Sequence, residues 1–166
     1  ALSESYRQHI ASGGAGPSKP VQLTGEELER LGVILDSVCV DAACSGNPGV
    51  LEYQGVETVS KELLFDAGPF DDGTVNMGEF LAIVQALALL KLDNRDCCVY
   101  SDSVTALAWV RNKRAKTTMP RTKTNEPLFQ MLEWAEAWLR DNTYSNRILK
   151  WNTEHWGEIP ADYGRK

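Results

Sequence analysis

The sequence has no long hydrophobic run. Its longest apolar stretch, residues 80–90, is interrupted by Gln85 and is far too short to span a bilayer. It also has no charged-then-apolar leader, so nothing in it supports secretion. The first residue is Ala1 rather than Met, which suggests a trimmed piece of a longer protein. We therefore expect no membrane partner and a cytoplasmic location.

Histidine and cysteine are both scarce: the sequence has two histidines and four cysteines. The cysteines, Cys39, Cys44, Cys97 and Cys98, do not have the spacing of metal ligands. Three of them fall in predicted core strands, where a free thiol behaves as a small hydrophobe. This favours a buried structural role over redox or metal chemistry, and it fits a reduced, cytosolic protein.

One long segment contains no acidic residue, although the net charge of the chain is −6. Residues 103–125 carry only basic charges, at Arg111, Lys113, Arg114, Lys116, Arg121 and Lys123. Such a block could neutralise several phosphates, and each contact would add salt-dependent affinity. The alternative is a solvated basic loop, which is what most charge runs are. Because the distribution of charge matters more than its sum, the net charge does not exclude a nucleic-acid partner.

The chain is long enough for one ordinary domain, with 166 residues of which 43% are hydrophobic. Residues 1–10 resemble the remnant of a helix, and residues 11–20 (ASGGAGPSKP) read as a flexible linker. Residues 24–27 form a capping-box pattern that opens a short helix ending at Gly32. We therefore divide the chain into an N-terminal part, residues 1–32, and a folded domain, residues 33–166.

Hydrophobic periodicity predicts three strands followed by alternating helices and strands. The predicted strands are residues 35–42, 50–59, 61–67, 97–100 and 147–151. The predicted helices are residues 76–92, 104–111 and 126–141. This order is typical of an α/β domain with a mixed sheet flanked by helices.

Four carboxylates occur where such a domain could bring them to one end of its sheet. Asp41 closes an apolar run and opens a glycine-rich turn (DAACSGNPG), and Glu79 lies in the first turn of the long helix. Asp102 follows the fourth strand and begins the next helix, and Asp162 lies almost at the C-terminus. Each residue taken singly has a structural alternative, as a turn residue, a helix cap, a favourable first-turn charge or a tail residue.

Clustered carboxylates repel one another and need a counter-charge, which Mg²⁺ or Mn²⁺ supplies in oxygen-rich sites. Two such ions can clamp the attacking and leaving oxygens during phosphodiester hydrolysis. The four residues together therefore predict a metal-dependent nuclease.

The motifs around these carboxylates resemble those of type 1 ribonuclease H, from Val38 to the C-terminus. They occur in the family's order: Asp41 with Gly46-Asn47-Pro48-Gly49, Thr74 to Glu79, Ser101-Asp102-Ser103, and then Trp151, His155 and Asp162. The segments GEF at residues 78–80 and WGEIPADYGRK at residues 156–166 are most similar to those of the bacterial viroplasmin-like branch.

This resemblance implies a five-stranded mixed sheet of the ribonuclease H-like fold, with strand order 3-2-1-4-5. Strands one and four would be neighbours, so Asp41 and Asp102 would face each other at their carboxyl ends. The resemblance also implies an endoribonuclease that cuts the RNA strand of RNA/DNA hybrids and leaves 3′-hydroxyl and 5′-phosphate ends. Asp41 would bridge two Mg²⁺ ions, with Mn²⁺ as a possible substitute, and Glu79, Asp102 and Asp162 would complete their shells.

The same resemblance implies which residues hold the substrate. The backbone around Ala43, Cys44 and Gly46, with the side chains of Asn47 and Asn76, would face the minor groove and the RNA sugars, whose 2′-hydroxyls distinguish RNA from DNA.

Further contacts would be made to the nucleic-acid backbone. Thr74 and Asn125 match positions that hold a phosphate of the DNA strand, but Asp72 stands where the family often has an arginine. Either another cation supplies that charge or this phosphate pocket is weaker. The segment carrying Arg111, Lys113, Arg114 and Lys116 would be the substrate-handling protrusion.

His155 and the C-terminal carboxylate leave open questions. In the family a loop histidine helps to activate water or to release product, and an imidazole with a pKa near neutrality suits that role. The alternatives are that His155 is a spectator on the surface, or that Glu154 or Glu158 acts instead by touching a metal or its water. The sequence given ends four residues after Asp162, without the family's long C-terminal helix, which predicts a mobile ligand.

The expected partner is an RNA/DNA hybrid, bound by a monomer with no obligate protein partner. The N-terminal residues resemble the end of a tether, so we expect an upstream hybrid-binding domain in the full-length protein. Two alternatives remain. A DNA-directed nuclease of the same fold, such as an integrase or resolvase, would lack the 2′-hydroxyl-reading residues Asn47 and Asn76. A non-catalytic hybrid-binding module would lack a complete acidic set.

Overall fold

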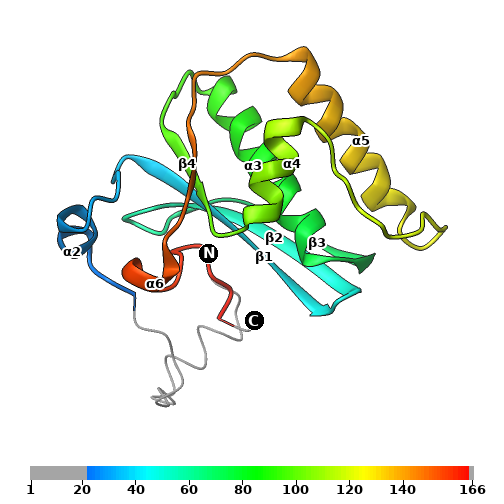
Figure 1. Cartoon of the computed structure of the whole chain (residues 1–166), viewed down its shortest axis with the longest axis horizontal. Coiled ribbons are helices and arrows are strands. Elements are labelled where there is room, and N and C mark those ends of the chain that lie inside the picture. The colour runs from blue at the N-terminus through cyan, green and yellow to red at the C-terminus, as the bar shows by residue number, and fades with distance from the viewer. Residues whose placement is uncertain (1–21, 165–166) are drawn as a thin grey trace.

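The sheet has five strands in the order β3-β2-β1-β4-β5 (Figure 1). The structure is a computed structural model, and it describes residues 22–164. The strands are β1 (Ser37–Gly46), β2 (Gly49–Glu57), β3 (Leu63–Gly73), β4 (Cys98–Ser101) and β5 (Ile148–Lys150). The pairs β1–β2 and β2–β3 are antiparallel, whereas β1–β4 and β4–β5 are parallel. The predicted mixed sheet and its strand order are confirmed.

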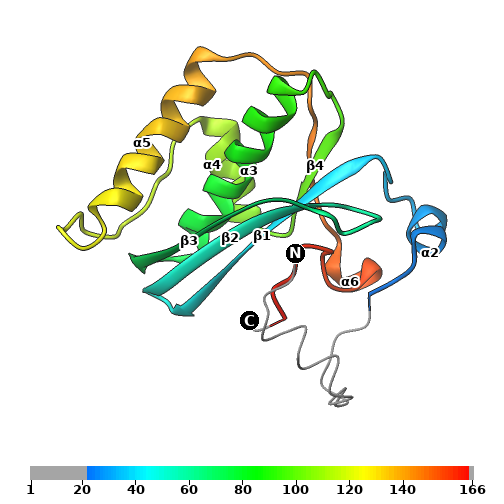
Figure 2. The same ribbon diagram turned by 180° about the vertical axis from the view of Figure 1, so that it is seen from behind.

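Helices cover both faces of this sheet unequally. They are α2 (Gly25–Arg30), α3 (Val75–Leu92), α4 (Val104–Asn112), α5 (Glu126–Asp141) and α6 (Thr153–Trp156). Figures 1 and 2 show α3, α4 and α5 on one side of the sheet, and α6 with the C-terminal segment on the other. The three long helices were predicted within one residue at each end, whereas α6 lies where only a loop was expected. The capping box at Thr24 and Glu27 is also confirmed at the start of α2.

The predicted N-terminal part is only partly visible in this structure. Its helix remnant and linker, residues 1–20, lie outside the described residues. The upstream hybrid-binding domain and the boundary at residue 32 therefore stay predictions.

The core consists of two apolar clusters, one on each face of the sheet. In β1, Val38, Val40 and Ala42 belong to the cluster beneath α3, α4 and α5. Cys39 belongs to the cluster on the other face, together with Tyr100 and Trp151. Because both faces are covered, the central strand reads as a continuous apolar run rather than an alternating one. All four cysteines are free thiols, and burial raises the pKa of Cys39, which fits the predicted structural role.

Helix α3 is longer than the apolar stretch of residues 80–90 considered above. With 18 residues and a mean hydropathy of 1.5, it is the one helix among the described residues with the length and composition to cross a membrane. About 61% of it is buried inside the structure, and core helices often have such a composition, so this is weak support for a membrane span.

Strand β1 does not end near Asp41, as the sequence had suggested, but continues to Gly46. Its antiparallel partner β2 pairs with it from Val38↔Glu57 to Gly46↔Gly49, so that only Asn47 and Pro48 form the turn. The ladder partner of Asp41 is Gln54. Predicting the end of the strand from its glycine-rich sequence was wrong because backbone pairing with β2 keeps the whole segment extended.

Strand β3 also continues beyond its predicted end, residue 67, as far as Gly73. The first half of β2 needs a partner on its outer side, and β3 supplies it through Leu51↔Phe70 and Gly49↔Gly73, with register shifts between the pairs. Gly68 permits this irregular path with φ +109, since a Cβ there would lie 2.6 Å from the carbonyl oxygen of Leu51.

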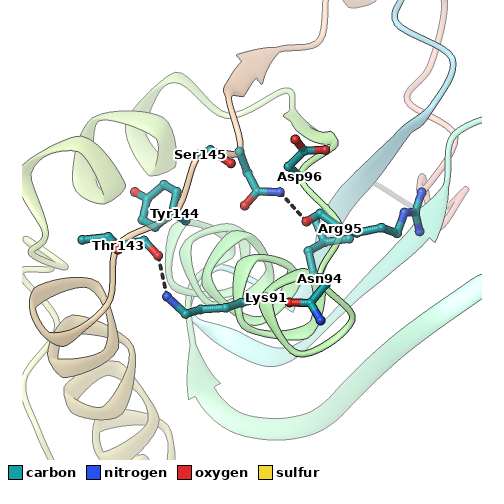
Figure 3. A pocket seen from close by; sticks show the side chains of 9 residues that line it. Lys91, Asn94, Arg95, Asp96, Thr143, Tyr144 and Ser145 are labelled. Atoms are coloured by element: carbon teal, nitrogen blue, oxygen red, sulfur yellow. Dashed lines mark hydrogen bonds between the residues drawn. The ribbon is translucent and has the colours of Figure 1, made fainter.

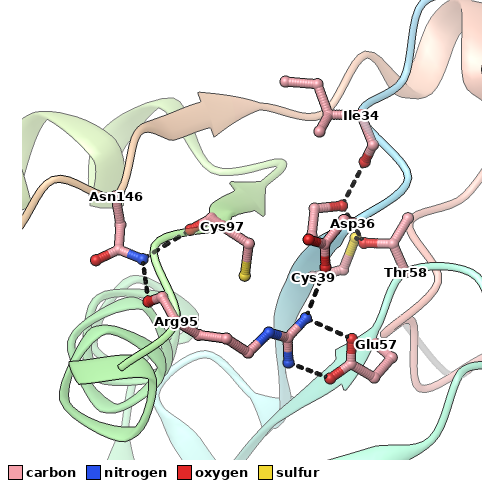
Figure 4. A network of polar contacts seen from close by, with 9 residues as sticks. Ile34, Asp36, Cys39, Glu57, Thr58, Arg95, Cys97 and Asn146 are labelled. Carbon is pink, nitrogen blue, oxygen red and sulfur yellow. Dashed lines mark hydrogen bonds and ion pairs between the residues drawn. The ribbon is translucent and has the colours of Figure 1, made fainter. Parts of the chain in front are cut away.

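An ion-pair network joins the other ends of the central strands (Figure 4). The guanidinium of Arg95 donates to both carboxylate oxygens of Glu57, at 2.6 and 2.9 Å, and to Asp36 at 3.0 Å. The Asn146 amide donates to the carbonyl oxygens of Arg95 and Cys97. The hydrogen bonds that the Arg95 guanidinium donates, above all those to Glu57, raise the pKa of Arg95. The network therefore fixes the region before β4 against β2 and the start of β1.

Candidate active site

Three carboxylates meet just beyond the last pair of the ladder between β1 and β4. One oxygen each from Asp41, Glu79 and Asp102 lies within 4.8 Å of the others. Asp41 and Glu79 are buried, with 0% and 2% exposure, while Asp102 is half-buried. Three of the four predicted ligands are therefore brought together, and they come from β1, from α3 and from the connection between β4 and α4.

The parallel ladder between β1 and β4 aligns two of them. Cys39 pairs with Tyr100, and this is the last pair of that ladder. Asp41 and Asp102 each follow two residues later in their segments. Since side chains alternate along a strand, Asp41 projects toward the same face as Cys39, while Asp102 directly follows the end of β4. Asp102 is not a helix cap, because Ser103 caps α4 by accepting from the Ala106 backbone N–H at 3.0 Å.

The third carboxylate reaches the site through a close helix–sheet contact. A Cβ at Gly78 would lie 2.6 Å from Leu51 Cδ1 and 2.8 Å from Ala42 Cβ, so only glycine lets α3 approach this closely. The next residue, Glu79, accepts a hydrogen bond from the Ala42 backbone N–H at 3.2 Å. Glu79 was predicted in the first turn of this helix. Because Thr74 caps α3, Glu79 lies in the second turn instead.

The donor set fits a divalent cation. Three carboxylates lie close together, and two of them are buried. Removing an ionised group from water typically costs several kcal/mol, and a bound cation offsets this cost. An ion of the size of Mg²⁺ is about 2.1 Å from each ligand oxygen, and three carboxylate oxygens that lie within 4.8 Å of one another can be drawn to such an ion. No second group of this kind occurs within residues 22–164. Asp41, Glu79 and Asp102 are thus the residues that could hold a metal.

Asp162 lies in the C-terminal segment, and its expected mobility stays a prediction. It is 8% exposed, and its backbone N–H donates to the carbonyl oxygen of Ile159 at 2.9 Å. Its Oδ2 accepts from the Gly164 backbone N–H at 3.1 Å. These two hydrogen bonds place the carboxylate within a compact turn. Asp162 is outside the three-residue group, so its role as a metal ligand stays a prediction.

His155 lies exposed on the short helix α6. Its backbone N–H is held by Asn152, whose side-chain oxygen accepts at 3.3 Å. Glu154 is also exposed and Glu158 is half-buried. The choice among these residues for a role in water activation or product release stays a prediction.

The residues expected to face the minor groove surround the β1–β2 turn and the start of α3. Asn47 joins the two, because its side-chain oxygen accepts from the Val75 backbone N–H at 3.1 Å. Gly46 and Asn47 are exposed and Asn76 is half-buried, whereas Ala43 is buried. Cys44 donates from its thiol to the carbonyl oxygen of Gly73 at 3.3 Å.

The two expected phosphate ligands have structural tasks of their own. Thr74 accepts from the Met77 backbone N–H at 3.3 Å as the cap of α3. Asn125 is 1% exposed; its oxygen accepts from the Thr122 N–H at 2.7 Å, and its amide donates to the carbonyl oxygens of Pro120 at 3.0 Å and Asp72 at 3.5 Å. A phosphate contact by Asn125 would have to replace one of these bonds.

The basic segment crosses from α4 to α5 as an extended loop. Arg111, Lys113, Arg114 and Lys116 are all exposed. Arg121 differs from them, since it forms ion pairs with Glu126 at 2.6 Å and with Glu133 at 3.0 Å. The backbone N–H of Ala115 donates to Glu136 at 2.8 Å, which anchors the loop to α5. Among the described residues, five exposed cations of the segment form no ion pair, and four of them lie at its α4 end, with Lys123 at the other end.

A separate cavity of about 580 Å³ lies at the far end of α3 (Figure 3). It is bounded by Leu90 and Asn146, and Lys91 beside it donates to the Thr143 carbonyl at 2.6 Å. Leu90 is 11 residues beyond Glu79, or about 16 Å along the helix, so this cavity is not part of the acidic site.

Comparison with known proteins gives structural neighbours but no family model that matches the sequence. RNase H1 from the halophilic archaeon Halobacterium salinarum has 17% identity over 75% of this chain and 91% of its own, with a TM-score of 0.47. LC11-RNase H1, isolated from compost by a metagenomic approach, has 18% identity over 71% and 84%, with a TM-score of 0.45. An N-terminal RNase H domain from Mycobacterium tuberculosis has 20% identity over 70% and 80%, with a TM-score of 0.42.

None of these scores assigns a role to any residue of this chain or connects it to the viroplasmin-like branch. The strand order, the parallel β1–β4 pair and the helices on both faces are features of the chain itself. On this topology, the chain has a ribonuclease H-like fold.

Proposed function

We propose that this protein is a metal-dependent endoribonuclease that hydrolyses the RNA strand of RNA/DNA hybrids, leaving 3′-hydroxyl and 5′-phosphate ends. The observation that supports this most strongly is the meeting of Asp41, Glu79 and Asp102 within 4.8 Å, with two of them buried. A purely structural carboxylate would not need two like charges beside it. Phosphodiester hydrolysis needs metal ions held by just such oxygens.

Each acidic residue then has a defined task. Asp41, Glu79 and Asp102 would hold divalent ions, Mg²⁺ or Mn²⁺, and Asp162 would complete the set. When bound, such ions make water a stronger nucleophile and stabilise the charge on the leaving oxygen. The hydrogen bond from Ala42 to Glu79 keeps that carboxylate oriented before any ion arrives.

Selection of a hybrid would come from two surfaces. Asn47 and Asn76, with the exposed backbone at Gly46, would contact the RNA sugars, whose 2′-hydroxyl both donates and accepts hydrogen bonds. The exposed cations between Arg111 and Lys116 would bind phosphates, and such contacts position a duplex without reading its sequence. We further propose that the domain acts as a monomer.

The test is incubation with labelled RNA/DNA, RNA/RNA and DNA/DNA duplexes of one sequence, each with Mg²⁺, Mn²⁺ or EDTA. Cleavage is expected only in the RNA strand of the hybrid and only with a divalent ion. Cleavage of DNA duplexes would indicate a DNA-directed nuclease instead. Tight hybrid binding without cleavage under any condition would indicate a non-catalytic binding module.

A further inference from the structure

The segment that carries Asp162 is held by side chains rather than by a strand ladder. Three of its carbonyl oxygens, on alternate residues, accept from side chains elsewhere in the chain. Trp151 Nε1 donates to Gly157 at 2.8 Å, Gln22 Nε2 to Ile159 at 2.9 Å, and Gln54 Nε2 to Ala161 at 2.6 Å. Residues 157–163 form no helix or strand, so these bonds, together with the burial of Ile159 and Ala161 in the core, hold the segment in place.

Gln54 differs from the other two donors in its position. It is 2% exposed on β2 and is the ladder partner of Asp41 on β1. Directly opposed residues of an antiparallel pair project from the same face, with Cβ atoms about 5 Å apart. The residue that accepts from Gln54 is Ala161, immediately before Asp162. One buried side chain therefore spans from the position opposite Asp41 to the residue preceding Asp162.

A buried amide is costly unless it is hydrogen-bonded, and an apolar residue of similar size would fill this space equally well. The burial of Gln54 therefore favours a specific role for its donor. The next residue pair on the same face of the sheet, Cys39 with Val56, is apolar and belongs to the core.

We infer that Gln54 is a positioning residue that fixes Asp162 relative to Asp41, so that the fourth carboxylate takes part in metal binding. This inference rests on the proposed function, since it concerns the same metal site. Gln54 touches neither the metal nor the substrate; it acts through the backbone of residue 161. Partners of this outer kind usually change metal affinity by about 10- to 100-fold when they are removed.

The test is a Mn²⁺ titration of the folded protein, with free Mn²⁺ measured by electron paramagnetic resonance. Gln54→Met removes the donor and keeps the volume, and we expect it to weaken Mn²⁺ binding by about 10-fold or more. Gln22→Met is the matched control, because it removes the same kind of bond two residues earlier, at Ile159. Its Mn²⁺ affinity should stay within about 2-fold of wild type.

A double-mutant cycle separates positioning from a general structural role. If Gln54 acts through Asp162, Gln54→Met should add little to the loss already caused by Asp162→Asn. A full and independent loss in the Asp162→Asn background would overturn the inference, as would wild-type affinity in folded Gln54→Met. Should Gln54→Met not fold, Gln54→Asn keeps the amide but shortens its reach, and the same cycle applies.

Failure of the proposed function gives a different result. Wild-type protein that binds no Mn²⁺ and cleaves no hybrid would overturn the metal site itself. Wild-type protein that binds Mn²⁺ and cleaves hybrids, with Gln54→Met unchanged in affinity, would overturn only the role of Gln54.

Discussion

Asp41 and Asp102 stand two residues beyond the same pair of the parallel ladder, Cys39 with Tyr100. The register of these two strands therefore brings two like charges together, and contacts elsewhere in the fold must hold that arrangement against their repulsion. The Arg95 network at the opposite end of these strands and the Gly78 contact beneath Glu79 are two such constraints. Each constraint can be tested separately from the chemistry.

Divalent ions should stabilise the fold. At a Mg²⁺ or Mn²⁺ concentration ten times the dissociation constant, the gain is about 1.4 kcal/mol, which corresponds to a rise in Tm of roughly 3–6 °C. Glu79→Gln should raise Tm in EDTA, because it relieves repulsion, and should reduce the shift on adding metal. Thermal unfolding followed by circular dichroism measures both. Equal shifts in wild type and Glu79→Gln would argue against ligation by Glu79.

Replacing the exposed cations of the basic segment should weaken hybrid binding without abolishing turnover. For Arg111, Lys113, Arg114 and Lys116 all changed to Ala, the log–log salt slope should flatten by about 0.9 per lost phosphate contact. Arg121→Ala is the control, because its charge is already paired with Glu126 and Glu133. Binding measured by fluorescence anisotropy at several salt concentrations tests this. An unchanged slope would make the segment a solvated loop.

A methyl group at Gly78 should disturb the metal site through the backbone. In Gly78→Ala the new Cβ meets Ala42 Cβ at 2.8 Å, a contact that only a shift of α3 or β1 can relieve. We expect a loss of about 1–3 kcal/mol in the free energy of unfolding, together with weaker Mn²⁺ binding. Urea unfolding and metal titration measure the two effects. A stable protein with normal Mn²⁺ affinity would show that this close contact does not position Glu79.

Arg95→Met should lower stability more than a matched change on the surface. The Arg95 guanidinium, 33% exposed, binds Glu57 with two hydrogen bonds and Asp36 with a third, so we expect a loss of about 1–3 kcal/mol. Arg121→Met breaks more exposed pairs and should cost less stability than Arg95→Met. Denaturant unfolding of both variants tests this order. Equal losses would place Arg95 among ordinary surface pairs.

The sequence predicts some of these features well because the signals are local. Helix α5 begins and ends where the periodicity of its apolar residues predicts it, and the three clustered carboxylates are among the four that the sequence predicts. Asp41 was misplaced at a strand end because the partner that extends β1 is supplied by another strand. Nothing local marks Gln54, since a lone glutamine acquires meaning only from the register opposite Asp41 and the distant carbonyl of Ala161.

The most direct test of the central claim compares wild type and Asp41→Asn on a labelled RNA/DNA hybrid with Mg²⁺, with analysis of the cleaved ends. The substitution removes the charge of the buried carboxylate without changing its size. We expect wild type to give 3′-hydroxyl and 5′-phosphate ends, and Asp41→Asn to give no cleavage while its circular dichroism spectrum stays unchanged. Full activity of Asp41→Asn, with the same ends, would contradict the assignment of this acidic cluster as the catalytic metal site.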